Sequence, residues 1–443
     1  MIALAFLGTL LIYAIGVSLM VRRTAGYCAA DLGFIFFSLC FLYTAAPGMT
    51  FLFLELDEVP GWPWMELNSL TPTEDALAVH LWRHNIFLLC FLLAYMFVRR
   101  RVDVVDFSRR VDSLGRRLGL KEIVFFIPLF FTFSILGNSI AGESDIYYEK
   151  YQVIESLGEW ERIVYALANR IAAGSQYFMV ISFVCLPIKK WLKVMGILAI
   201  AFYQLLMSSG SRVELLFFII AGGVAYALFV NKVKLRYVFF AALCGLCSFW
   251  FIEVFRYYEF DLAETIQHFQ AFGVKPMGEL GAVFSTGFHL YSLSEVGQLP
   301  LRDGKMFFFE IMSLFSSNAN SHLSPQSWYW REFYPNYPVP PQTNGPIADS
   351  ALWGLGLFDL AIRACIIGFI FGWLTNKVFG RELSFVWAVI YIFYCATCVM
   401  TLKYGVLWQL NPIVKTMLPL IGVYYFYKLI LRGLRSAPNN FSV

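Results

Sequence analysis

The sequence predicts an all-α integral membrane protein that crosses the bilayer many times, and three observations lead to this fold class. Of its 443 residues, 59% are hydrophobic, 18% aromatic and only 14% charged, whereas a soluble protein carries about a quarter charged residues. Apolar stretches of about 18 or more residues recur along the chain, and each can cross ~30 Å of hydrocarbon as a helix. Backbone polar groups in lipid must pair within their own segment, which favours a helical bundle.

We count about eleven apolar stretches. They lie near residues 2–21, 32–53, 76–98, 123–140, 163–187, 192–207, 213–230, 237–254, 359–376, 384–402 and 412–430. The chain then divides into residues 1–254 with transmembrane helices 1–8, residues 255–358 forming one large outer loop with interfacial helices, and residues 359–443 with helices 9–11 and a basic inner tail. A loop of this length is usually functional. Its segments 261–272 and 305–315 have helical periodicity.

The distribution of charge predicts the orientation, since Lys and Arg are enriched in cytoplasmic loops. With Met1 placed outside, most of the 34 basic residues fall on the inner side and most of the 30 acidic residues on the outer side. The net charge of +4 conceals this asymmetry and does not predict nucleic-acid binding. Because basic residues follow the first apolar run, we expect no cleavable signal peptide.

Cysteine and histidine patterns do not favour a metal site or a cofactor. Cys244-x-x-Cys247 and Cys395-x-x-Cys398 fall inside apolar spans, where packing is the usual role of cysteine. His80 and His84 are four residues apart, but no third ligand is near in the sequence. We therefore predict neither a metal nor a cofactor.

Arginines at the outer ends of the spans are the candidate anion ligands. An arginine at membrane depth costs roughly 2.5–3.5 kcal/mol by insertion scales, so we expect a compensating partner. Its planar fork of donors suits phosphate oxygens. We predict that a diphosphate is bound by four arginines, Arg212 in the turn Ser208-Ser209-Gly210-Ser211-Arg212, Arg256, Arg170 and Arg83.

Carboxylates give these arginines an alternative role in ion pairs. Glu214, Glu253 and Glu259 are near enough in the sequence to neutralise some of them. For Arg363, an ion pair with Asp359 at i,i+4 is the simplest expectation.

The outer loop also supplies candidate proton acceptors and sugar contacts. Histidine transfers protons at neutral pH, so our candidates for a general base are, in order, His289, His322, Asp349 and Glu259. Aromatic faces with polar donors suit sugar rings, although an interfacial aromatic belt explains them equally well. The predicted glycan contacts are Trp328, Trp330, Tyr334, Tyr337 and Asn344.

This layout resembles the Wzy-type polymerases of bacterial O-antigen and related polysaccharides. The similarity lies in many spans, a short outer turn ending at Arg212, an arginine closing the next outward span at Arg256, and then one long outer loop. The segment Pro340-Pro-Gln-Thr343-Asn344-Gly345, followed by Trp353-Gly354-Leu-Gly356 and a span, is similar to the end of that loop in the family.

The resemblance implies a GT-C-like fold and a metal-independent glycosyltransferase in the bacterial inner membrane. Such an enzyme joins oligosaccharide repeat units carried on undecaprenyl pyrophosphate, with its active site facing the periplasm. The outer arginines would hold the lipid pyrophosphates, and apolar grooves between spans would hold the prenyl tails. Membrane lipid, a chain-length regulator and a flippase of the same pathway are the further partners it suggests.

Three other functions stay open at this point. An O-antigen ligase would share the fold and the arginines. A flippase or other carrier of lipid-linked oligosaccharide would need charges along a path through the bundle, whereas these gather at the outer face. A membrane acyltransferase usually takes its donor from the cytoplasm, yet all five histidines lie on the outer side.

Overall fold

The structure is a computed structural model. It describes residues 1–45, 74–103, 107, 111, 113–114, 120–141, 153–154, 156–207, 212–237, 240, 261–272, 293, 332, 356–380, 383–404 and 413–436. Every regular element in this part of the chain is a helix. The prediction of an all-α protein is therefore confirmed for these residues.

Among the residues described, five segments are long and apolar enough to cross a membrane, so the chain is a multi-pass membrane protein. They are α1 (Ile2–Thr24), most of α5 (Glu74–Val98), most of α7 (Leu120–Ala141), α18 (Gly356–Phe379), and the segment Ile413–Ile430 formed by η4 (Ile413–Met417) and the start of α22 (Leu418–Ser436).

Further helices coincide with other predicted apolar stretches. They are α2 (Leu32–Cys40), α9 (Glu159–Cys185), α10 (Lys190–Met207), α11 (Arg212–Phe229), α19 (Phe385–Thr397) and α20 (Val399–Tyr404). The predicted span 237–254 lies almost wholly outside the described residues. From the large outer loop the structure describes α13 (Leu262–Phe272), which confirms the helical periodicity of 261–272, whereas 305–315 lies outside the described part.

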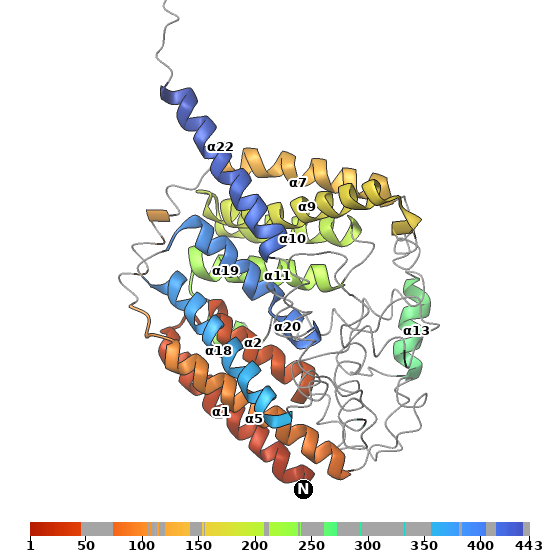
Figure 1. Cartoon of the computed structure of the whole chain (residues 1–443), viewed down its shortest axis with the longest axis vertical. Coiled ribbons are helices and arrows are strands. Elements are labelled where there is room, and N and C mark those ends of the chain that lie inside the picture. The colour runs from red at the N-terminus through yellow and green to blue at the C-terminus, as the bar shows by residue number, and fades with distance from the viewer. Residues whose placement is uncertain are drawn as a thin grey trace, which may run out of the picture.

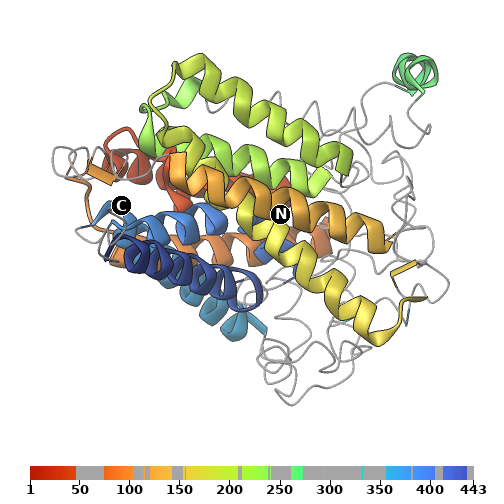
Figure 2. The same ribbon diagram turned by 90° about the horizontal axis from the view of Figure 1, so that it is seen from above.

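The helices form two groups with α19 between them (Figures 1 and 2). In one group α5 packs against α1 and α18, and α2 contacts α18. In the other, α9 packs against α7 and α11, and α10 packs against α11. Helix α19 contacts α2, α9 and α11 and so joins the groups.

The outward faces of these helices are apolar, as expected when the surrounding solvent is hydrocarbon. Leu4 and Leu11 of α1 and Leu93 and Phe97 of α5 are exposed, with 90% of Phe97 accessible. Such a surface would aggregate in water, and it supports placing these helices in a bilayer.

Small residues allow α5 and α18 to pack closely. A Cβ added to Gly368 would lie 2.5 Å from the carbonyl oxygen of Phe91, and one added to Gly372 would lie 3.1 Å from that of Tyr95. The spacing of four puts both glycines on one face of α18. This is the small-xxx-small arrangement that brings membrane helices close together.

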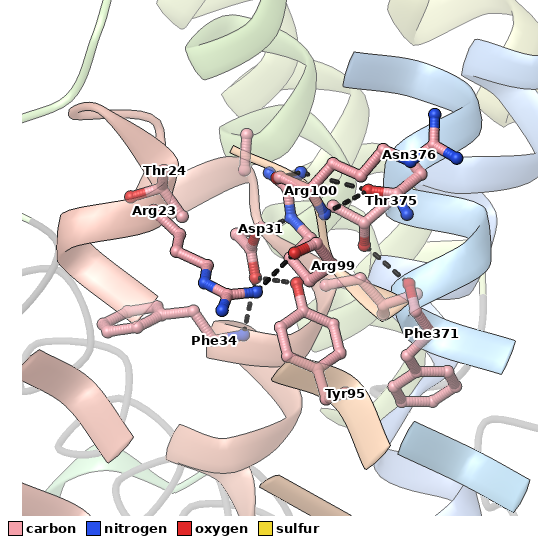
Figure 3. A network of polar contacts seen from close by, with 12 residues as sticks. Arg23, Thr24, Asp31, Phe34, Tyr95, Arg99, Arg100, Phe371, Thr375 and Asn376 are labelled. Carbon is pink, nitrogen blue, oxygen red and sulfur yellow. Dashed lines mark hydrogen bonds and ion pairs between the residues drawn. The ribbon is translucent and has the colours of Figure 1, made fainter. Parts of the chain in front are cut away.

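A polar network surrounds a buried ion pair at one end of the bundle (Figure 3). We call this network the basic-end joint, because charge bias places this end of the helices on the basic, inner side. Asp31 precedes α2 and accepts a hydrogen bond from the Phe34 backbone N–H at 3.0 Å, as an N-cap does. Its carboxylate also accepts from the Tyr95 hydroxyl at 2.6 Å and from Arg99 Nε at 3.2 Å. Both side chains of the Asp31–Arg99 pair are almost completely buried.

Three further side chains join other helices to the joint. Arg23 of α1 donates to the carbonyl oxygens of Met96 and Arg99. Asn376 of α18 donates to the Val98 carbonyl at 2.7 Å and accepts from the Arg100 N–H at 2.9 Å. The hydroxyl of Tyr391 in α19 donates to the Ala30 carbonyl at 2.7 Å and accepts from the Leu32 N–H at 2.8 Å. The joint therefore connects α1, α2, α5, α18 and α19.

Predicted inner ends also meet within the second helix group and between the two groups. Lys428 of α22 pairs with Glu122 of α7 at 2.7 Å. Lys232, just after α11, donates to the Ala25 carbonyl at 3.3 Å and lies 4.8 Å from the Tyr27 ring centre. Within each group and between the two groups, the helix ends that charge bias places inside therefore meet one another. We call this side of the bundle the basic end and the opposite side the outer end.

Candidate functional site

The outer end carries helical segments of irregular geometry. Helix α2 continues as the π-helix η2 (Phe41–Ala45), α19 ends at Thr397 before the short α20, and the last span begins with the π-helix η4. Pro419 explains the irregularity of η4, because proline lacks a backbone N–H and its ring clashes with the carbonyl four residues earlier. Single π-helical turns inside helices are frequent at functional sites.

Helix α9 and η4 each carry a basic residue at the outer end. Arg170 of α9 and Lys415 of η4 are both half-buried, and the two elements pack against each other. One turn further along α9, a Cβ added to Gly174 would lie 3.1 Å from Thr416 Cγ2 and 1.9 Å from Leu420 Cδ1. Side chains of η4 and α22 therefore pack directly against Gly174, and two basic residues on such packed elements are candidates to bind phosphate oxygens.

Arg170 lies further from the start of its helix than the sequence suggests. Because α9 begins at Glu159 rather than near residue 163, Arg170 is about three turns into the helix instead of one or two. The sequence points to Arg170 but not to Lys415, whose π-helical setting follows from Pro419. A basic residue within one turn before a helical proline was the available signal.

Arg83 lies elsewhere in the bundle. It is half-buried on α5, which packs against α1 and α18, whereas α9 packs against α7, α11 and η4. The structure therefore does not bring Arg83 and Arg170 onto neighbouring helices. Arg83 and Arg170 therefore belong to different helix groups. A shared diphosphate site of the remaining arginines stays a prediction.

Arg83 has two buried histidines beside it, His80 and His84. The Nε2 atom of His84 lies 3.3 Å from the Tyr13 hydroxyl of α1. Asn85, the residue after His84, accepts from the Thr9 hydroxyl at 2.7 Å. No group of three His, Cys, Asp or Glu side chains that could hold a metal is found in the described residues. These polar groups join α1 to α5 within the membrane.

The predicted helical hairpin around Arg212 is confirmed at the level of the backbone. Helix α10 ends at Met207, α11 begins at Arg212, and the two pack against each other. The turn 208–211 and the Arg212 side chain lie outside the described part. The other predicted site residues outside it are Arg256, His289, His322, Asp349, Glu259, Trp328, Trp330, Tyr334, Tyr337 and Asn344.

The predicted Asp359–Arg363 ion pair is confirmed. Arg363 Nε lies 3.2 Å from Asp359 Oδ1, and both side chains are buried. This arginine has its counter-charge on its own helix, so we do not count it among the phosphate ligands.

An open apolar groove of about 630 Å³ runs between α5 and α18. Its lining residues are Leu93, Ala94, Phe97, Cys365, Ile366, Phe369 and Ile370. The groove lies on the lipid-facing side of two membrane-spanning helices and suits a hydrocarbon chain. Comparison of the chain with protein-family models, with curated protein sequences and with solved structures finds no match.

Proposed function

We propose that this chain is a polymerase that joins undecaprenyl-pyrophosphate-linked oligosaccharide repeat units into a surface polysaccharide. The observation that carries the proposal is the presence of two half-buried basic residues, Arg170 of α9 and Lys415 of η4, on packed elements at the outer end of a membrane bundle. Basic residues at this depth favour a negatively charged ligand at the membrane surface. A lipid diphosphate at the membrane surface is an anion of this kind.

Charge and topology support the same proposal. Most basic residues lie on the predicted inner side, so the outer end would face the periplasm of a bacterial inner membrane. The full proposal is a GT-C-like bundle of about eleven spans with residues 255–358 as one large periplasmic loop. The groove between α5 and α18 would hold a prenyl chain of the substrate or of bulk lipid.

The proposed reaction replaces one bond to the anomeric carbon by another. A hydroxyl oxygen of the acceptor repeat unit attacks the anomeric carbon of the donor chain, and the bond from that carbon to the lipid pyrophosphate breaks. The hydroxyl proton passes to a base, for which His289 is the first candidate, followed by His322, Asp349 and Glu259. The outer cations stabilise the charge that develops on the leaving diphosphate, so we expect no requirement for a metal.

Deletion of the gene followed by a gel of the surface glycan tests the proposal. Product limited to a single repeat unit is the expected result. Lipid-linked polymer that is not transferred to lipid A would instead indicate a ligase. Absence of surface glycan with trapped cytoplasmic precursor would indicate a flippase.

A further inference from the structure

We propose that the apolar groove between α5 and α18 binds an anionic phospholipid of the inner leaflet, with one acyl chain along the groove and the phosphate held by Lys377 and Arg100. This inference goes beyond the proposed function and does not depend on it. It assigns the groove to a bound membrane lipid rather than to the prenyl chain of the substrate.

The close approach of the two helices forms the floor of the groove. Gly368 meets the backbone of α5 without a side chain between them, and a Cβ placed there would lie 3.0 Å from Ala94 Cβ. Larger side chains line the groove beside this contact. Leu93 and Phe97 on α5 and Phe369 on α18 are among them, and all three are exposed. The groove is therefore open to the surrounding lipid and has apolar walls, which suit an acyl chain.

The level of the groove in the bilayer favours a lipid of the inner leaflet. Trp373 of α18 and Trp387 of α19 meet edge to face with ring centres 5.6 Å apart. Tryptophan is enriched at membrane–water interfaces, so this pair marks the inner boundary of the hydrocarbon. The groove residues of α18 extend from Cys365 to Ile370, which is ~5–12 Å before Trp373 at a rise of ~1.5 Å per residue. Half of the hydrocarbon core is ~15 Å thick, so the groove lies within the inner leaflet.

The groove continues towards the basic end on the same face of α18. At ~100° per residue, Trp373 and Lys377 fall at angles between those of Phe369 and Ile370 around the helix axis. The Lys377 ammonium lies 5.8 Å from the Trp373 ring centre and 5.9 Å from the Trp387 ring centre. Cation–π contacts with both rings favour this position of the ammonium at the level of the interface. A lipid chain in the groove therefore has its headgroup beside Lys377.

Arg100 brings a second cation to the same end of the groove. Its backbone N–H donates to Asn376 Oδ1 at 2.9 Å, so the end of α5 is fixed beside the residue that precedes Lys377 (Figure 3). Arg100 is exposed, as is Arg101 after it, and the exposed carboxylate of Asp103 offsets one of these charges. The net charge of these groups is positive, and basic residues beside the inner leaflet attract anionic lipid headgroups.

Photocrosslinking tests the site. Purified full-length protein in detergent micelles is titrated with phosphatidylglycerol that carries a diazirine near the middle of one acyl chain, and crosslinked residues are identified by mass spectrometry. Label should concentrate on the groove residues of α5 and α18. Unlabelled phosphatidylglycerol should compete more strongly than zwitterionic phosphatidylethanolamine with the same acyl chains. Label spread evenly over all lipid-facing helices, or equal competition by the two lipids, would overturn the proposal.

Variants separate the contributions of charge and shape. Lys377→Ala and Arg100→Ala should each weaken the apparent affinity for phosphatidylglycerol by about fivefold, and Lys377→Arg should retain it. Lys189→Ala, exposed at the basic end of the other helix group, is the matched control and should leave it unchanged. Leu93→Trp should obstruct the groove and reduce labelling, whereas Leu11→Trp, similarly exposed on α1, should not. Unchanged affinity in both alanine variants would overturn the headgroup contact, and unchanged labelling in Leu93→Trp would overturn the position of the acyl chain.

Competition with a prenyl ligand distinguishes this inference from the proposed function. Geranylgeranyl pyrophosphate should displace the labelled phosphatidylglycerol no better than phosphatidylethanolamine does. If it competes as strongly as unlabelled phosphatidylglycerol, the groove belongs to the prenyl substrate. The inference then fails, whereas the proposed function stands.

Discussion

Removing one partner of the buried Asp31–Arg99 pair should destabilise the protein strongly. Arg99 Nε lies 3.2 Å from the carboxylate, and the two side chains are only 2% and 1% exposed. At an effective dielectric constant of about 20, unit charges ~4 Å apart attract by about 4 kcal/mol. Leaving either charge buried alone typically costs about 3–5 kcal/mol. We therefore expect Asp31→Asn to lower the free energy of unfolding by about 3–5 kcal/mol.

A double-mutant cycle provides the assay. The free energy of unfolding is measured by denaturant titration in mixed micelles for Asp31→Asn, Arg99→Met and the double variant. The double variant leaves neither charge buried alone. Its loss of unfolding free energy should therefore be smaller than the sum of the two single losses by at least about 1 kcal/mol, because residues in contact show coupling energies of about 0.5–3 kcal/mol. Asp75→Asn, an exposed carboxylate of α5, is the control and should change stability by under about 1 kcal/mol. Additive losses, or a neutral Asp31→Asn, would refute the reasoning.

Three further predictions concern packing, hydrogen bonding and the site. Gly368→Leu should disrupt the α5–α18 contact and lower the free energy of unfolding by at least about 1–3 kcal/mol. Gly223→Leu, where no neighbouring atom lies within 4 Å, should lower it much less. Equal effects of the two variants in denaturant titrations would contradict the close packing. Tyr391→Phe should cost about 1–3 kcal/mol, since a buried carbonyl and a buried N–H lose their partner, and an unchanged unfolding midpoint would exclude this role. Arg212→Ala and Arg256→Ala should leave protein levels intact but abolish glycan chains longer than one repeat on a gel. Replacement of either arginine by Lys should have the same effect if bidentate phosphate contact matters. Normal glycan ladders from both Ala variants would argue against these two ligands.

Features that depend on local sequence were predictable. Continuous apolar runs located the described helices other than α13, because a segment in lipid must satisfy its own backbone. The Asp359–Arg363 pair followed from i,i+4 spacing alone. The hairpin of α10 and α11 followed from a four-residue polar break between two apolar runs.

Features that depend on distant contacts were not predictable from the sequence. Asp31 and Arg99 are 68 positions apart, and neither residue by itself indicates that the other lies beside it. Arg83 and Arg170 have similar predicted depths, but membrane depth does not determine which helices are neighbours. Lys415 lies on η4, which packs against α9, and nothing in the local sequence of either element indicates that they are neighbours.

Reconstituted polymerisation tests the central claim most directly. Purified full-length protein in liposomes is supplied with undecaprenyl-pyrophosphate-linked repeat units in the presence of a metal chelator. We expect glycan chains of two or more repeats, with one lipid pyrophosphate released for each new linkage, and loss of both products in Arg170→Ala. Repeat units that cross the bilayer without any new glycosidic bond would contradict the central claim.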